Sequence, residues 1–194
     1  MKSQKLYAYL KNRCDSPQAP WIMAAVSFLE SWISPFPPDP MLALLILARR
    51  SQTWRLTALC GISSVVGGIV GYFIGLLAYN TLGLWLIKIY HLETSMTTLE
   101  ASFQKWGFWI IVFKAFTPIP FKLVTILSGI LHLDFMTFLW ASTLARFGRF
   151  YLFSAFVWYY NRQIDELLQR HMGSLIILGC LMMVVAIGAL RWFN

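Results

Sequence analysis

Charged side chains are scarce in this sequence. Of its 194 residues, 12% are Asp, Glu, Lys or Arg and 58% are hydrophobic, and the mean hydropathy is +0.63. An average soluble domain has about 25% charged residues. So few charges cannot cover the surface of a soluble globule, and the composition therefore predicts a multi-pass membrane protein.

The sequence also lacks the patterns of a disulfide framework, a metal centre or a common hydrolase. Its three cysteines are far apart and contain no C-x-x-C spacing. The histidines His91, His132 and His171 lie in connecting segments, no two acidic residues have metal-ligand spacing, and no serine lies in a nucleophile elbow. We therefore expect no cofactor, no metal and no enzymatic activity.

The net charge of +8 comes mainly from basic residues at the ends of apolar runs, where they would face anionic lipid. We therefore expect membrane lipids as partners and no nucleic acid. Nine Lys and Arg lie on one side (residues 2–13, 49–55 and 162–170) and three on the other. The positive-inside rule then predicts a cytoplasmic N-terminus. We expect the membrane to be a plasma membrane, the inner membrane of a bacterium.

Prolines break two of the apolar runs near their middle. A proline removes a backbone donor and disfavours helix in the residue before it. The two breaks contain Pro35, Pro37 and Pro38 in the first run and Pro118 and Pro120 in the second. The residues on either side of each break are fewer than the about 20 that a spanning helix needs. The pattern predicts two re-entrant helix hairpins whose turns line a cavity.

These segments predict an all-α integral membrane protein. Two Pro-broken re-entrant hairpins in inverted repeat, each followed by a long transmembrane helix, are the architecture of secondary transporters. A basic N-terminal segment (1–20) would precede the transport domain (21–160), with repeat one at 21–90 and repeat two at 106–160. A polar connector and a C-terminal transmembrane helix (161–194) would follow. Gly67, Gly71 and Gly75, four residues apart, predict close helix packing, with backbone approach to a ligand as the alternative.

Six ionisable residues fall at membrane depth: Glu30, Asp39, Lys114, Lys122, Arg146 and Arg149. Each would cost about 2.5–3.5 kcal/mol unpaired at a helix centre, so they must pair or reach water. Superposing the two Pro-x-Pro motifs sets Asp39 opposite Lys122 and Glu30 near Lys114. Two acids and four bases leave two positive charges in excess, which a lipid phosphate would match.

We interpret the two acids, Glu30 and Asp39, as proton-coupling residues and the four bases as phosphate-binding residues. A carboxylate among cations in a low-dielectric cavity can exchange protons near neutral pH. The alternative is that Lys114 and Glu30 form a fixed salt bridge and that Arg146 or Arg149 extends to an interface.

The sequence resembles the DedA family, also called the SNARE-associated Golgi or VTT domain family, and most closely its YqaA-like branch. The resemblance rests on Phe28-Leu29-Glu30, on Pro35-Phe36-Pro37-Pro38-Asp39 and on the segment from Phe116 to Lys122. It implies paired re-entrant hairpins, essential acids at Glu30 and Asp39, and lipid movement across the bilayer. Many members have two arginines six apart around one proline, whereas this chain has lysines eight apart around Pro-x-Pro.

The expected function is transport of a phosphate-bearing lipid, a polyprenyl phosphate or a phospholipid, coupled to protons. The first alternative is an uncoupled lipid scramblase. The second is a membrane enzyme acting on lipid phosphates.

Overall fold

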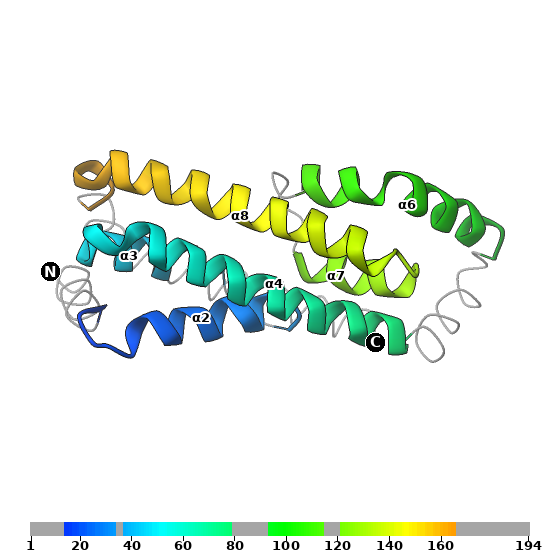
Figure 1. Ribbon diagram of the computed structural model, residues 1–194, viewed down its shortest axis with the longest axis horizontal. Coiled ribbons are helices and arrows are strands. Elements are labelled where there is room, and N and C mark those ends of the chain that lie inside the picture. Colours follow the sequence, from blue (N-terminus) through cyan, green and yellow to red (C-terminus); the bar gives the residue numbers. More distant parts are fainter. Residues whose placement is uncertain (1–13, 34–36, 79–92, 115–120, 166–194) are drawn as a thin grey trace, which may run out of the picture.

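The computed structural model describes residues 14–33, 37–78, 93–114 and 121–165, with backbone alone for 93–101 and 114 (Figure 1). Every regular element in these ranges is a helix, so the predicted all-α class is confirmed. The elements are α2 (Ala19–Glu30), α3 (Asp39–Ala48), the 3₁₀ turn η1 (Arg50–Gln52), α4 (Thr53–Ala78), α6 (Glu93–Lys114), α7 (Phe121–Ile130) and α8 (Phe135–Tyr159).

Proline sets the boundaries of the short helices. Helix α2 has 12 residues and α3 has 10, and each carries a proline in its first turn, where the missing N–H is not needed. Pro37 and Pro38 directly precede Asp39, the first residue of α3. Pro35, Pro118 and Pro120 lie outside the described residues, as do residues 1–13 of the predicted N-terminal segment and the predicted C-terminal helix.

Two long helices organise the bundle. Helices α4 and α8 have 26 and 25 residues, and they pack against each other along the length of the bundle. Helices α2 and α3 lie toward one end and α6 and α7 toward the other (Figure 1). Helix α4 contacts α2, α3 and α7, while α8 contacts α3 and α6. Each long helix therefore touches helices from both ends of the bundle.

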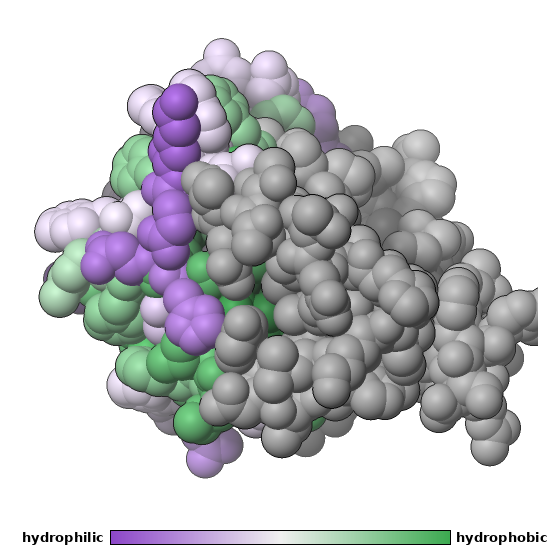
Figure 2. Space-filling view, turned by 90° about the vertical axis from the view of Figure 1, so that its right-hand side faces the viewer, coloured by the Kyte–Doolittle hydropathy of each residue, from purple (hydrophilic) through white to green (hydrophobic). Residues whose placement is uncertain are grey.

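Among the described residues, one continuous helical stretch, Arg50–Ala78, is long and apolar enough to cross a bilayer, with a mean hydropathy of 1.9. Three shorter apolar helices accompany it: α2, α3 and α7. Viewed from the end where α4 finishes, hydrophilic side chains lie beside hydrophobic ones (Figure 2). A mixture of this kind is typical of the end of a membrane bundle, where side chains meet head groups and water.

The glycines of α4 allow very close helix packing. A Cβ atom added at Gly67 would overlap the carbonyl oxygen of Phe28 in α2, and one added at Gly75 would overlap that of Ile126 in α7. From the α7 side, a Cβ at Gly129 would overlap the carbonyl oxygen of Tyr72. The predicted packing role of the α4 glycines is therefore confirmed, because α4 meets both α2 and α7 at backbone distance.

Gly129→Ala is expected to destabilise the protein. The new methyl group would push α7 away from α4, and such overpacking typically costs about 1–3 kcal/mol. Gly148 in α8 is the matched control, because a Cβ there meets nothing within 4 Å. Thermal unfolding of the purified protein in detergent should show a clear loss for Gly129→Ala and no loss for Gly148→Ala. Equal unfolding temperatures would contradict the close packing.

The turn between α7 and α8 is tightly defined. His132 has a φ of 50°, and Asp134 caps α8 by accepting a 2.8 Å hydrogen bond from the backbone N–H of Thr137. The hydrogen bonds from Thr137 lower the pKa of Asp134 below its usual value, which keeps the capping carboxylate charged. The cap therefore determines the residue at which α8 begins. It thereby also determines how far along the bundle the later residues of α8 lie.

Two apolar clusters form the core, and a charged region separates them. One cluster joins α2, α3, α4 and α8 and includes Phe150; the other joins α4, α6, α7 and α8 and includes Ala145. In the second, Tyr72 stacks on Phe138 with ring centroids 4.8 Å apart. Arg146 follows Ala145 directly, so the charge lies where the two cores meet.

Candidate functional site

The centre of α8 presents two arginines to the break between α2 and α3. Arg146 and Arg149 are three residues apart, which places them on one side of the helix about one turn apart. Helix α2 ends at Glu30 and α3 begins at Asp39, so an acid flanks each side of the proline-rich break. The fold therefore brings two acids from one segment to two bases from another.

The first ion pair is buried. Nη2 of Arg146 lies 2.6 Å from Oε2 of Glu30, and the two side chains are 3% and 14% exposed. The ring of Phe121, the first residue of α7, lies over the guanidinium, with 3.8 Å between Cζ of Arg146 and the ring centroid. Removal of either partner would leave the other charge buried without compensation.

The second ion pair is more open. Nη2 of Arg149 lies 2.6 Å from Oδ2 of Asp39, and the two side chains are 39% and 19% exposed. The other carboxylate oxygen of Asp39, Oδ1, is buried and has no hydrogen-bond partner within the described structure. Because Arg149 is reachable from outside, a ligand could contact its guanidinium without displacing the core.

The predicted pairing of Asp39 with Lys122 is wrong. Asp39 pairs with Arg149, and within the described ranges no ion pair includes Lys122. The superposition of the two Pro-x-Pro motifs compared the turns with each other and ignored α8, which lies alongside the first turn and supplies both partners. The side chain of Lys114 lies outside the described residues, and the described partner of Glu30 is Arg146.

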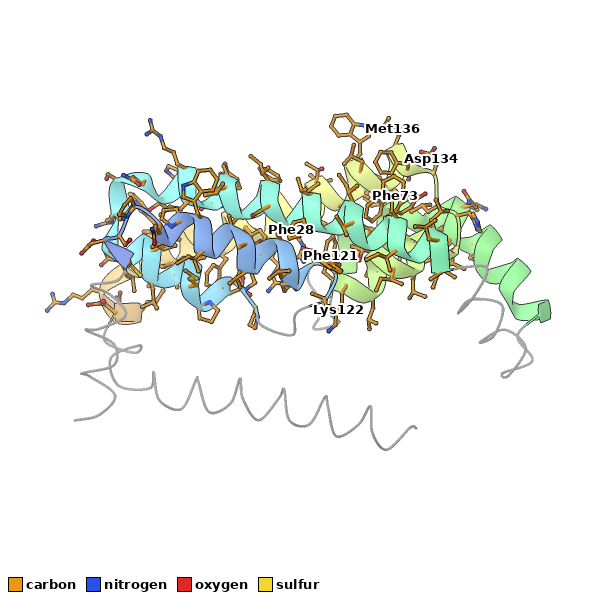
Figure 3. The ribbon with its side chains drawn as sticks, turned by 90° about the horizontal axis from the view of Figure 1, so that it is seen from below. Phe28, Phe73, Phe121, Lys122, Asp134 and Met136 are labelled. Carbon is orange, nitrogen blue, oxygen red and sulfur yellow. The ribbon has the colours of Figure 1, made fainter. Side chains whose placement is uncertain are left out.

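Of the predicted basic residues whose side chains the structure describes, Lys122 is the one that forms no ion pair with a described acid. It lies in the first turn of α7 and is half-buried beside Phe121, about midway along the bundle and at its edge (Figure 3). Because each arginine neutralises one carboxylate, Lys122 is the surplus positive charge among the described members of the predicted set. The site can therefore attract one anionic group while both ion pairs remain intact.

The ion pairs leave further donors and acceptors unused. Each arginine contacts its acid through Nη2, and Nε of Arg146 is buried without a partner in the part of the chain that the structure describes. Two planar N–H groups can hold two oxygens of a carboxylate or phosphate. In the described residues, no three His, Cys, Asp or Glu side chains lie close enough to share a metal ion.

Sequence reasoning missed the small hydroxyl residues around the first pair. Ser31 follows Glu30 directly, and its Oγ lies 3.5 Å from Nη2 of Arg146 and 2.9 Å from Oγ of Ser64. Thr125 in α7 donates to the carbonyl oxygen of Ser31 at 3.2 Å. Ser27 and Ser31 are four residues apart on α2, and this repeat is the signal that could have indicated a buried polar face.

Comparison with known proteins identifies a family and uncharacterized relatives. The VTT domain family model matches residues 17–159. An uncharacterized protein of Haemophilus influenzae is 26% identical over 168 residues, which cover 85% of this chain and 84% of the relative. An uncharacterized protein of Histophilus somni is 26% identical over 127 residues, which cover 66% of each chain. No solved structure matches the chain.

Proposed function

This chain belongs to the VTT domain family, the DedA family of membrane proteins, and from this premise we propose that it moves a phosphate-bearing lipid across the bilayer in exchange for, or together with, protons. The substrate would be a polyprenyl phosphate or a phospholipid. The single observation that carries the proposal is a pair of acid–arginine contacts at the centre of the bundle, one buried and one open to a ligand.

In this proposal, α2 with α3 and α6 with α7 are two re-entrant hairpins in inverted repeat. Three features support it: each pair flanks a proline-rich break, each is followed in sequence by a long helix, and the two pairs lie toward opposite ends of the bundle (Figure 1). Such a repeat holds the substrate near the bilayer midplane between its halves. The charged site would lie at that level, because it joins Glu30 at the end of α2 and Asp39 at the start of α3 to the arginines of α8, with Phe121 at the start of α7 over one of them.

The phosphate would bind between Arg149 and Lys122. Arg149 supplies a planar fork and is the more exposed arginine, while Lys122 supplies a point charge that no described acid neutralises. Arg146 would contribute its positive field from beneath Phe121. The hydrocarbon part of the lipid would remain outside the bundle, where α6 offers an apolar hollow of about 540 Å³ lined by Trp106, Trp109, Ile110 and Phe113.

Protonation would link the acids to the lipid. A proton on Asp39 removes the negative charge that competes with phosphate for Arg149, so proton binding favours lipid binding at the same guanidinium. Deprotonation restores the ion pair and favours release. A proton on Glu30 would free Arg146 in the same way at the buried pair, although the side chain of Arg146 is much less exposed than that of Arg149.

Two alternatives predict different behaviour. An uncoupled scramblase would use the same site as a hydrophilic path for lipid head groups and would transport no protons. A membrane enzyme acting on lipid phosphates would need a nucleophile or an activated water, and the two carboxylates of this site are already engaged by arginines. We therefore propose a transporter and no enzymatic activity, located in a bacterial inner membrane with the N-terminus in the cytoplasm.

A liposome assay tests the proposal. Purified protein would be reconstituted with a fluorescent phospholipid, or with a fluorescent polyprenyl phosphate in parallel, and a membrane-impermeant quencher would report the lipid in the outer leaflet. We expect faster movement with a pH gradient than without one, and none for a neutral lipid with the same tails. Equal rates with and without the gradient would favour the scramblase, and no movement of any lipid would contradict both.

A further inference from the structure

Ser31 lies at a junction of four helices. It is fully buried directly after the end of α2, and its atoms contact residues of α2, α4, α7 and α8. Little space surrounds its side chain, because a Cβ added at Gly67 of α4 would come within 3.0 Å of Cβ of Ser31. A small side chain here can reach several elements at once.

The hydroxyl group of Ser31 is fully used. It donates to the carbonyl oxygen of Ser27 at 3.0 Å, which takes its one hydrogen. Oγ of Ser64 at 2.9 Å must then be the donor to one lone pair of Ser31. The second lone pair faces Nη2 of Arg146 at 3.5 Å, the nitrogen that also donates to Glu30 at 2.6 Å.

The main chain of Ser31 makes a second connection. Oγ1 of Thr125 lies 3.2 Å from the carbonyl oxygen of Ser31 and 2.9 Å from that of Lys122. One hydroxyl therefore joins the end of α2 to the first turn of α7, which carries both Phe121 and Lys122. The residue after Glu30 thus contacts the arginine that pairs with Glu30 and is connected to the turn that carries Lys122.

We propose that Ser31 is the positioning residue of the charged site: its hydroxyl holds the Arg146 guanidinium against Glu30. The inference rests on the proposed function for its effect on transport, but the positioning itself concerns only the geometry of the ion pair. Without the hydroxyl, Arg146 loses a fixed neighbour on the side of α2, and Glu30 spends more time unpaired.

The test compares three buried serines that lose the same atom. Ser31→Ala removes the contact with Arg146. Ser27→Ala removes the hydrogen bond to the carbonyl oxygen of Cys60 but keeps the carbonyl that accepts from Ser31, and Ser64→Ala removes a donor to Ser31 without touching Arg146. All three are fully buried, so their general effect on stability should be similar.

Lipid transport provides the first readout. In liposomes, Ser31→Ala should lower the maximal rate about fivefold, less than the full effect of a hydrogen bond to a charged group because the contact is 3.5 Å long. The half-saturating lipid concentration should not change, because Ser31 does not touch the lipid. Ser27→Ala and Ser64→Ala should stay within about twofold of the unmodified protein. Equal losses in all three alanine variants would overturn the proposal.

Chemical labelling separates this inference from the proposed function. A hydrophobic carbodiimide reacts with protonated carboxyl groups within membranes, and mass spectrometry would measure its attachment to Glu30. Ser31→Ala should increase the labelling, whereas Ser27→Ala should not. Increased labelling in a protein that moves no lipid would support the positioning role and reject transport, whereas unchanged labelling would reject the positioning role. If Ser31→Ala does not fold, Ser31→Cys takes its place, because the thiol is a weaker donor and acceptor.

Discussion

Asp39→Asn is expected to abolish proton-coupled lipid movement while the protein remains folded. The asparagine keeps the size of the side chain but carries no charge and cannot take up a proton, so Arg149 no longer has a partner whose charge changes. The effect on stability should be small, because Arg149 is 39% exposed and a pair of this kind contributes about 0–1 kcal/mol. The liposome assay with a pH gradient measures the transport rate, and thermal unfolding in detergent measures the stability.

Three substitutions of bases serve as controls for this prediction. Arg149→Lys keeps the charge but loses the planar fork, so it should weaken transport of the phosphate lipid more than Lys122→Arg, which retains a base. Lys122→Ala, by contrast, should stop transport, since it removes the surplus charge. If Asp39→Asn and Lys122→Ala both transport at the full rate, the site is assigned wrongly. If Arg149→Lys and Lys122→Arg are equally mild, the arginine acts as a structural partner of Asp39 alone.

Arg146→Met should destabilise the protein far more than Arg149→Met. The methionine leaves the carboxylate of Glu30 at 14% exposure without its base, and breaking a buried ion pair from one side costs about 3–5 kcal/mol. The open pair should lose at most about 1 kcal/mol. Unfolding temperatures of the two variants in the same detergent give the comparison directly.

The double variant Glu30→Gln with Arg146→Met identifies the cause of that loss. It removes both charges, so most of the stability should return, since a well-packed neutral pair is often as stable as a buried ion pair. Transport should not return, because neither the proton acceptor nor the buried base is present. A double variant as unstable as Arg146→Met would show that the packing of the arginine under Phe121, rather than the unpaired charge, explains the loss.

Much of the site could be predicted because it depends on local chemistry. A proline inside a helical run breaks it, and therefore Glu30 and Asp39 could be placed at the two sides of a break. The three-residue separation of Arg146 and Arg149 likewise predicted that both lie on one side of one helix. The glycines of α4 likewise predicted close packing, although not that they meet backbone atoms of both α2 and α7.

The partners of the acids could not be predicted in the same way. Glu30 and Arg146 are 116 residues apart in sequence, and Asp39 and Arg149 are 110 apart. The motif comparison favoured the lysines because they occupy the matching turn, yet which base is nearest depends on which helix packs beside the break. The role of Ser31 has the same origin, since its contacts come from three other helices that no local pattern brings together.

Local sequence patterns are sufficient to establish an all-helical membrane chain with charged residues inside its apolar runs, two proline breaks and a glycine surface on its first long helix. These features follow from residues close to one another along the chain and from the free-energy cost of placing charges and unpaired backbone groups in hydrocarbon. The three-dimensional arrangement was needed for the rest: α8 lies against the ends of α2 and α3, Arg146 is covered while Arg149 is open, and no acid in the described part of the chain pairs with Lys122. Those outcomes depend on helix packing, which sets distances between residues far apart in sequence and leaves one pair dry and the other within reach of a ligand.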